Sequence, residues 1–289
     1  MEMLREMLSY PFLVRALAGG ILVSLCASLL GVSLVLKRYS MIGDGLSHVS
    51  FGALSFAVAF GWSPLRVSVP VVVVAAFFLL RIRSNGKMKS DAAIAMISAV
   101  ALAAGIIVTS MTTGMTTDVS SYMFGSILAM SKEDVRLSVV LSVFVLGLFL
   151  ICYNKIFAVT FDENFARATG VNVSWYNVLI AVLTAVTIVL GMRMMGAMLI
   201  SSLIIFPSLT SMRVFKSFRG VVISSGVLSV VCFVIGMMAS YRYSTPAGAS
   251  VVMVNLAAFL AFSAADYIVR MSRADKKVGH GLAGKEELQ

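Results

Sequence analysis

The chain has 289 residues, of which 60% are hydrophobic and only 12% are charged, and its mean hydropathy is +0.98. A soluble domain carries about 25% charged residues, so this composition excludes an ordinary soluble protein. The formal net charge of +10 does not indicate nucleic-acid binding, because the Lys and Arg residues flank apolar runs and form no basic-aromatic repeat.

Nine apolar runs follow one another along the chain, separated by short polar or basic segments. Since about 20 apolar residues cross a bilayer as a helix, the pattern predicts an all-α polytopic membrane protein with about eight to nine transmembrane helices. Residues 1–270 are expected to form a single transmembrane domain, and residues 271–289 a charged cytoplasmic tail. The predicted spans are 12–36, 41–61, 65–80, 92–111, 137–156, 173–192, 196–212, 220–239 and 247–269.

The basic residues also predict the orientation of the chain. If the loop after the third span is cytoplasmic, sixteen of the 23 Lys and Arg residues lie on the cytoplasmic side. Cytoplasmic loops carry the excess of these residues in membrane proteins. The N-terminus is therefore expected outside and the C-terminus inside.

The second span carries two titratable side chains far from its ends. Asp44 and His48 are four residues apart, so on a helix they lie on one face, with Ser47 beside them. Ionisable groups inside a bilayer are costly and usually functional. Imidazole suits zinc, and carboxylate suits manganese as well, so the pair predicts a transient cation site on a transport path that Ser47 helps to line. The alternative is an Asp–His hydrogen bond that locks two helices.

The outer loop between the fourth and fifth spans offers a third candidate metal ligand, Asp118. Residues 122–130 of this loop are apolar but too few to cross a bilayer, so we expect a half-helix at the outer face. If this half-helix folds inward, Asp118 can join Asp44 and His48.

The inner loop 160–170 predicts a two-turn helix outside the bilayer. Asp162 can cap its N-terminus, Glu163 suits the positive end of the helix dipole, and Gly170 is a natural stop. Phe161 and Phe165 are then free to contact a partner. An amphipathic helix lying on lipid headgroups is the alternative.

Two further features of the sequence concern the energy source for transport and the shape of the transport path. The sequence has no Gly-x-x-x-x-Gly-Lys-Ser/Thr phosphate loop, so any ATPase must be another chain, with the 161–170 helix as its candidate docking point. Pro207 interrupts the seventh span and predicts either a broken helix beside the pathway or a packing kink.

Five segments in order resemble the permeases of bacterial ABC importers for zinc, manganese and iron(II). They are 36–48, which contains Ile-Gly-Asp-Gly-Leu-Ser-His, then 121–128, 161–170, 196–211 with Pro207, and 240–249. The segments span most of the chain. After His48 the family shows a Leu-Pro-Gly-like turn, where this chain reads Val-Ser-Phe-Gly, so the resemblance does not extend to the bend of this helix.

The resemblance implies a fold similar to that of the cobalamin importers, in a multi-pass protein of the bacterial cytoplasmic membrane. Two permeases are expected to pair around a central path, as a homodimer or, alternatively, a heterodimer. A cytoplasmic ABC ATPase dimer is expected to bind below, and an extracellular or periplasmic metal-binding protein to dock outside. Asp44 and His48 are expected to contribute to the metal path. The ATPase-coupling helix is expected to include Phe161, Asp162, Glu163, Phe165, Ala166 and Gly170.

On this reading the chain is not an enzyme and needs no cofactor, because the divalent metal is its cargo and ATP binds to the partner subunit. A proton-coupled secondary metal transporter that uses Asp44 and His48 is one alternative. A permease for a metal chelate is another alternative. The Asp44–His48 pair argues against it, because a bulky chelate needs no direct protein ligands. The residues themselves do not choose between zinc, manganese and iron.

Overall fold

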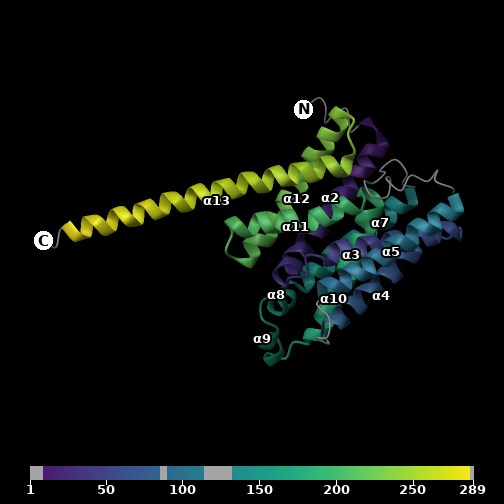
Figure 1. The fold of residues 1–289 in the computed structure, drawn as a ribbon, viewed down its shortest axis with the longest axis horizontal. Coiled ribbons are helices and arrows are strands. Elements are labelled where there is room, and N and C mark those ends of the chain that lie inside the picture. The colour runs from purple at the N-terminus through teal and green to yellow at the C-terminus, as the bar shows by residue number, and fades with distance from the viewer. Residues whose placement is uncertain (1–8, 85–89, 114–131, 287–289) are drawn as a thin grey trace.

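The computed structural model describes residues 9–84, 90–113 and 132–286, and these residues form helices joined by short turns, as the sequence predicts. The helices pack into one elongated bundle (Figure 1). In chain order they are α2 (Pro11–Leu36), α3 (Ile42–Ala59), α4 (Pro64–Ser84), α5 (Ser90–Thr113), α7 (Lys132–Ile151), α8 (Tyr153–Phe161), α9 (Glu163–Ala168), α10 (Val173–Met195), α11 (Ala197–Val214), α12 (Phe218–Tyr243) and α13 (Ala247–Glu286).

Within the described residues, 6 helices are long and apolar enough to cross a membrane, or up to 7 if one bent pair counts as a single span. The six are α2, α5, α10, α11, α12 and α13. The bent pair is α7 and α8, which meet at Cys152 at an angle of 69°. The straight span expected over residues 137–156 is therefore wrong in shape, because the helix turns away after Ile151.

The count is lower than the eight to nine spans that the sequence predicted, and α3 and α4 explain the difference. Both are helices where spans were expected. However, α3 is only 18 residues long, and its Asp44 and His48 lower its hydropathy. The described apolar part of α4 is the shorter stretch Pro64–Leu79.

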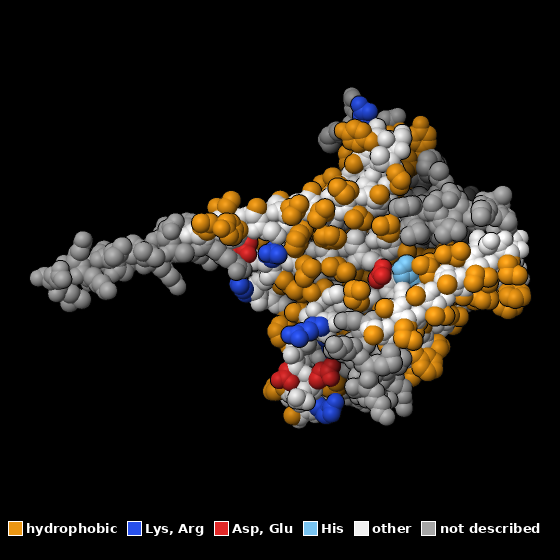
Figure 2. Space-filling model, in the orientation of Figure 1, with side chains coloured by type: hydrophobic (Ala, Val, Ile, Leu, Met, Phe, Trp, Pro, Cys, Tyr) orange, Lys and Arg blue, Asp and Glu red, His pale blue; other side chains and the backbone are white. Residues whose placement is uncertain are grey.

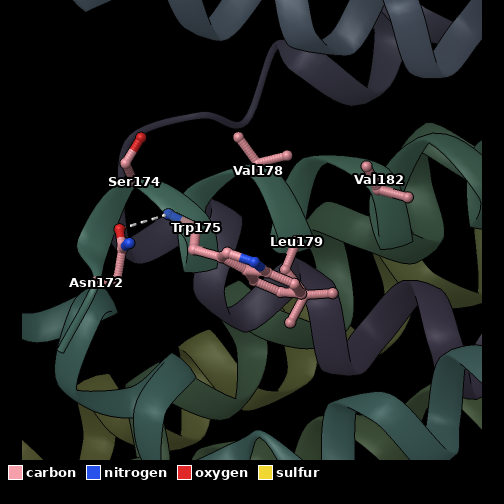
Figure 3. A pocket seen from close by; sticks show the side chains of 6 residues that line it. All are labelled: Asn172, Ser174, Trp175, Val178, Leu179 and Val182. Atoms are coloured by element: carbon pink, nitrogen blue, oxygen red, sulfur yellow. Dashed lines mark hydrogen bonds between the residues drawn. The ribbon is translucent and has the colours of Figure 1, made fainter.

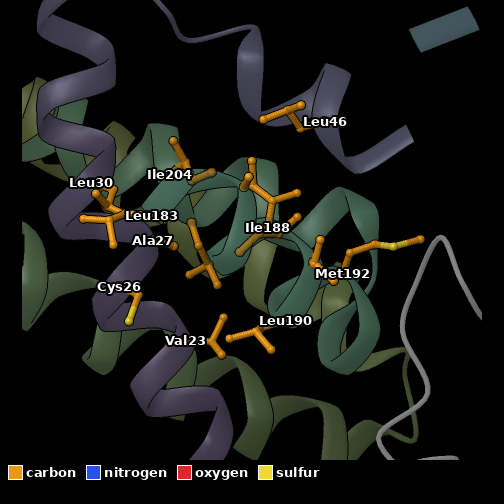
Figure 4. Close-up of a cluster of buried hydrophobic side chains, with 14 of the residues drawn as sticks. Val23, Cys26, Ala27, Leu30, Leu46, Leu183, Ile188, Leu190, Met192 and Ile204 are labelled. Carbon is orange, nitrogen blue, oxygen red and sulfur yellow. The ribbon is translucent and has the colours of Figure 1, made fainter. Parts of the chain in front are cut away.

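The centre of the bundle is formed by α2 and α10. In α10, 83% of the apolar window is buried, and in α2 67%, whereas in α13 the share is 17%. Val23 and Leu30 of α2 pack in one core with Leu183 and Ile188 of α10 (Figure 4). The far part of α13 leaves the bundle (Figure 1), so the residues expected to form a charged tail continue this helix as far as Glu286.

Glycines allow the closest helix contacts. A Cβ atom built on Gly31 of α2 would lie 2.1 Å from the carbonyl oxygen of Ile204 in α11. At Gly52 of α3 the distance to the carbonyl oxygen of Ala101 in α5 would be 2.7 Å. Small residues let helix backbones approach in this way inside a membrane, where no hydrophobic force drives helices together.

Serine hydroxyls join α11 and α12 to the same side of α2. Ser208 and Ser225 each donate to the carbonyl oxygen of Ser28 at 3.3 Å, and Ser229 donates to that of Ser24 at 3.1 Å. All of these side chains are buried. Because each hydroxyl has a partner on another helix, the three helices are held in register by polar contacts as well as by packing.

Candidate functional site

The structure brings Asp44 and His48 together at the start of α3. The Nε2 atom of His48 lies 3.7 Å from the Oδ2 atom of Asp44, and the two side chains are 20% and 52% exposed. Figure 2 shows a His side chain beside an acidic one on a largely hydrophobic face. A separation of 3.7 Å is too long for a hydrogen bond. The two groups are close enough to face one ion, and whether they form a cation site or an Asp–His lock stays a prediction.

Ser47, which lies between Asp44 and His48 in the sequence, makes its hydrogen bond within the helix. The Ser47 hydroxyl donates to the carbonyl oxygen of Asp44 at 2.7 Å, and Ser47 is fully buried. Its hydroxyl hydrogen is thus used within the helix, and whether Ser47 lines the pathway stays a prediction. The helix runs without interruption from Ile42 to Ala59.

Within the part of the chain that the structure describes, no group of three or more His, Cys, Asp or Glu side chains is placed to hold a metal ion. Asp118 and the expected outer half-helix lie outside the described residues. The described chain therefore contributes two candidate ligands, an imidazole and a carboxylate. A site with so few ligands suits an ion that must be released again.

The short helix α9 forms at the inner loop for the reasons that the sequence suggested. The Oδ1 atom of Asp162 accepts hydrogen bonds from the backbone N–H groups of Asn164 and Phe165, at 2.9 and 3.0 Å, as an N-cap. Glu163 occupies the first turn. Gly170 has a φ of +81°, which a glycine adopts without strain and which ends the segment.

The two phenylalanines of this loop sit on different helices. Phe165 projects from α9 and is 62% exposed, whereas Phe161 is the last residue of α8 and is 60% exposed. The Phe161 ring contacts Phe157 and Phe218, with centroids 5.0 and 6.1 Å apart. The helix itself is shorter than the predicted segment, because its six residues begin only after Asp162.

Ala166 fixes α9 to the rest of the molecule on its inner side. It is completely buried and packs with Val159, Val171 and Val173, from α8 and the start of α10. One face of α9 is thus anchored while Phe165 is presented outward. This arrangement suits a helix that contacts another protein.

A polar contact that the sequence did not predict joins α9 to α2. Lys37 donates from Nζ to Oε1 of Glu163 at 2.7 Å and also to Oδ1 of Asn177. Partial burial raises the pKa of the Glu163 carboxyl, but the hydrogen bonds and charge of Lys37, with Asn177, outweigh it, so the pKa lies below its ordinary value. The ion pair therefore persists at neutral pH and is lost only as the pH falls through that lowered pKa.

Pro207 lies inside α11 and is buried, and the helix continues through it from Ala197 to Val214. The Ser208 hydroxyl shares its one hydrogen between the carbonyl oxygens of Ile204, at 2.9 Å, and Ser28, at 3.3 Å, and Thr210 donates to the carbonyl of Phe206. The helix is therefore not broken at this proline. Whether Pro207 lines the pathway stays a prediction.

A hollow of about 450 Å³ lies beside the start of α10 (Figure 3). The Oδ1 atom of Asn172 caps this helix by accepting from the backbone N–H of Trp175 at 3.2 Å. The lining has no Asp, Glu, His or Cys, so it offers no metal-binding side chain. The lining residues are Asn172, Ser174, Trp175, Val178, Leu179 and Val182.

Comparisons with known proteins agree on one kind of protein. The profile of the "ABC 3 transport family" matches residues 9–266. A "probable metal transport system membrane protein" of Treponema pallidum is 30% identical over 86% of this chain and 94% of its own length. The manganese import system permease protein ScaB of Streptococcus gordonii is 27% identical over 90% of this chain and 93% of its own.

The chain is also similar to a zinc-uptake protein and to a protein of known structure. The high-affinity zinc uptake system membrane protein ZnuB of Haemophilus influenzae is 26% identical, covering 87% of this chain and 96% of its own length. The structure of PsaBC from Streptococcus pneumoniae, in complex with Fab, superposes with a TM-score of 0.81 at 28% identity. That match covers 90% of this chain and 94% of the other.

Proposed function

This chain belongs to the ABC 3 transport family, and on that premise we propose that it imports zinc or manganese by alternating access. It is a multi-pass membrane permease subunit of a divalent-metal ABC transporter. The proposal goes further in three respects: it names the metal, the partner chains and the residues that contact the ion.

The observation that carries the proposal is the Asp44–His48 pair on α3. Asp44 lies in the first turn of α3 and His48 one turn further along, and ionisable groups within a predicted membrane span are costly and usually functional. The two groups are one turn apart, are not hydrogen-bonded to each other, and are partly exposed in the single chain. A second copy of the permease around a central path would place further ligands opposite them.

The proposed transport cycle uses two regions of the molecule, the Asp44–His48 pair and the helix α9. A metal-binding protein delivers the ion from outside, and the Asp44–His48 region holds it in passing. An ABC ATPase dimer on the cytoplasmic side binds α9, where Phe165 offers an exposed aromatic side chain. Closure of the ATPase on ATP moves α9 and switches the permease between outward- and inward-facing states. The permease itself makes and breaks no covalent bond.

Zinc and manganese remain the two candidate ions because an imidazole and a carboxylate are acceptable ligands for both. Relatives of this chain are named for each of these metals. The metal-binding protein, which meets the ion first, is expected to set much of the selectivity.

The test is elemental analysis of metal-starved cells that carry or lack this chain. Deletion is expected to lower the cellular content of one divalent metal, and the wild-type chain supplied on a plasmid restores it. The same uptake should stop when the partner ATPase is inactivated and continue when the proton gradient is collapsed with ATP held constant. Unchanged zinc, manganese and iron contents on deletion would rule out the importer function. Uptake that follows the proton gradient would point to a secondary transporter.

A further inference from the structure

Lys37, at the end of α2, is a buried cation with two defined partners. Its side chain is only 5% exposed, and its ammonium lies 2.7 Å from the Glu163 carboxylate. It also donates to the Asn177 side-chain oxygen, and the Asn177 amide donates to the same Glu163 oxygen at 3.2 Å. A lysine this deeply buried requires such pairing, because an unpaired buried charge is strongly unfavourable.

The three residues of this Lys37 cluster come from three separate elements. Lys37 ends α2, Glu163 begins α9, and Asn177 lies in the second turn of α10. The lysine is 126 residues from Glu163 and 140 from Asn177 along the chain. The cluster therefore links the short helix that faces the cytoplasmic partner to the two central helices of the bundle.

The backbone that follows Lys37 leads directly to the metal pair. Arg38 adopts a left-handed conformation with a φ of 59°, and the N–H of Tyr39 bonds to the carbonyl of Leu34 at 2.7 Å. The chain then enters α3 at Ile42 and reaches Asp44 in its first turn. Four residues, 38–41, thus separate Lys37 from the start of α3.

Side chains of the turn and of α3 share one cavity with the cluster. Lys37 and Asn177 line it together with Tyr39, Ile42 and Leu46, the last two from the helix that carries Asp44 and His48. The cavity is small, about 10 Å³, which is close to the least that one water molecule needs. Lys37 and the base of α3 thus line the same small cavity, and in a closely packed interior a displacement of Lys37 is expected to shift the side chains at the base of α3.

We propose that Lys37, held by Glu163 and Asn177, is the positioning residue that passes movement of α9 to the α2–α3 turn and so to Asp44 and His48. This inference rests on the proposed function and names the route by which the ATPase end of the permease reaches its metal pair. Lys37 contacts neither the ion nor ATP. Its role is to make the two ends of the molecule move together.

The test uses the whole transporter in lipid vesicles, with its ATPase and binding protein, and measures metal ions moved per ATP hydrolysed. Lys37→Met keeps the length of the side chain and removes its charge, and Glu163→Gln removes the charge of the partner. Lys37→Met, which lies outside the docking helix, is expected to retain the ATPase and its hydrolysis. Both variants are expected to move at least about fivefold fewer ions per ATP hydrolysed, the lower end of typical coupling effects.

The exchanged pair, Lys37→Glu with Glu163→Lys, separates coupling from mere stability. The Asn177 amide can serve either partner, since it has both a donor and an acceptor. The double variant is expected to recover most of the ion-to-ATP ratio. The exposed Lys155→Met, at the same end of the molecule, is the control and should keep the wild-type ratio.

Three results would overturn the inference. They are a normal ratio in both single variants, an exchanged pair no better than either single variant, and loss of ATPase binding in step with transport. If Lys37→Met does not insert, the half-exposed Glu163→Gln still decides the matter. A wild-type complex that moves no metal at all would instead contradict the proposed function, so the two failures are distinguishable.

Discussion

The carboxylate of Asp44 and the imidazole of His48 lie on adjacent turns of one helix with 3.7 Å between their nearest polar atoms. Their spacing in the sequence is enough to predict that arrangement, because positions four apart share a helix face. The sequence also offered Asp118 as a third ligand, and that residue lies outside the described part of the structure. Its place at the site therefore stays a prediction.

At the residue scale, we expect Asp44→Ala and His48→Ala each to reduce metal uptake at least about tenfold. Loss even of groups that only support metal ligands costs about 10–100-fold in affinity or activity. The measurement is uptake of radioactive zinc and manganese into cells with matched amounts of each variant in the membrane. Ser50→Ala on the same helix is the control, because the buried Ser50 hydroxyl has no hydrogen-bond partner among the residues that the structure describes. Normal uptake by both variants would remove the pair from the path.

The ion pair of Lys37 could not be predicted from the sequence pattern. In the sequence it is one of many basic residues beside apolar runs, a position that predicts only a cytoplasmic location for its end of the helix. Its partners, Glu163 and Asn177, are more than a hundred positions away. Only the packing of α2 against α10 brings them together, so no local signal could have identified the cluster.

At the element scale, local chemistry predicted α9 well and α8 poorly. Asp162 and Gly170 bound the inner segment as expected, since capping and chain reversal depend on neighbouring residues alone. The bend of 69° at Cys152 had no such signal, as neither proline nor glycine lies there. Packing of Phe149 and Phe218 around Tyr153 accompanies the turn.

The exposed face of α9 provides a prediction for this element. Phe165→Ala should weaken binding of the partner ATPase by about 2 kcal/mol, roughly thirtyfold, as is common for an aromatic anchor at an interface. Titration of the purified permease in detergent with labelled ATPase measures this directly. Phe56→Ala, an exposed phenylalanine on α3, is the matched control and should bind as wild type. Equal affinities for wild type and Phe165→Ala would place the docking surface elsewhere.

At the scale of the whole molecule, hydropathy predicted where helices form better than it predicted which of them are apolar enough to span. All nine predicted runs are helices, but α3 and α4 fall short of the usual length or hydropathy of a span. In α3 this follows from Asp44 and His48, which stand where other spans have apolar residues. The contacts between helices were not predictable, since they depend on which small residues meet.

Those contacts give a prediction for the assembled bundle. Gly31→Ala should destabilise the protein by about 1–3 kcal/mol, because the new methyl group meets the Ile204 carbonyl and forces α2 and α11 apart. Thermal unfolding of the purified chain in detergent measures the effect as a lowered midpoint. Gly147→Ala is the matched control, since a Cβ there has nothing within 4 Å. An unchanged midpoint for Gly31→Ala would show that the two helices can separate freely.

The Lys37–Glu163 pair also has a consequence for biogenesis. A ribosome makes Lys37 early, and Glu163 emerges 126 residues later. While α2 is inserted, Glu163 has not yet been made, so we expect the positive charge of Lys37 to help retain its end of the helix in the cytoplasm. Folding later pairs that charge with the Glu163 carboxylate. We therefore expect the same ammonium group to direct topology in the nascent chain and to hold helices together in the finished one.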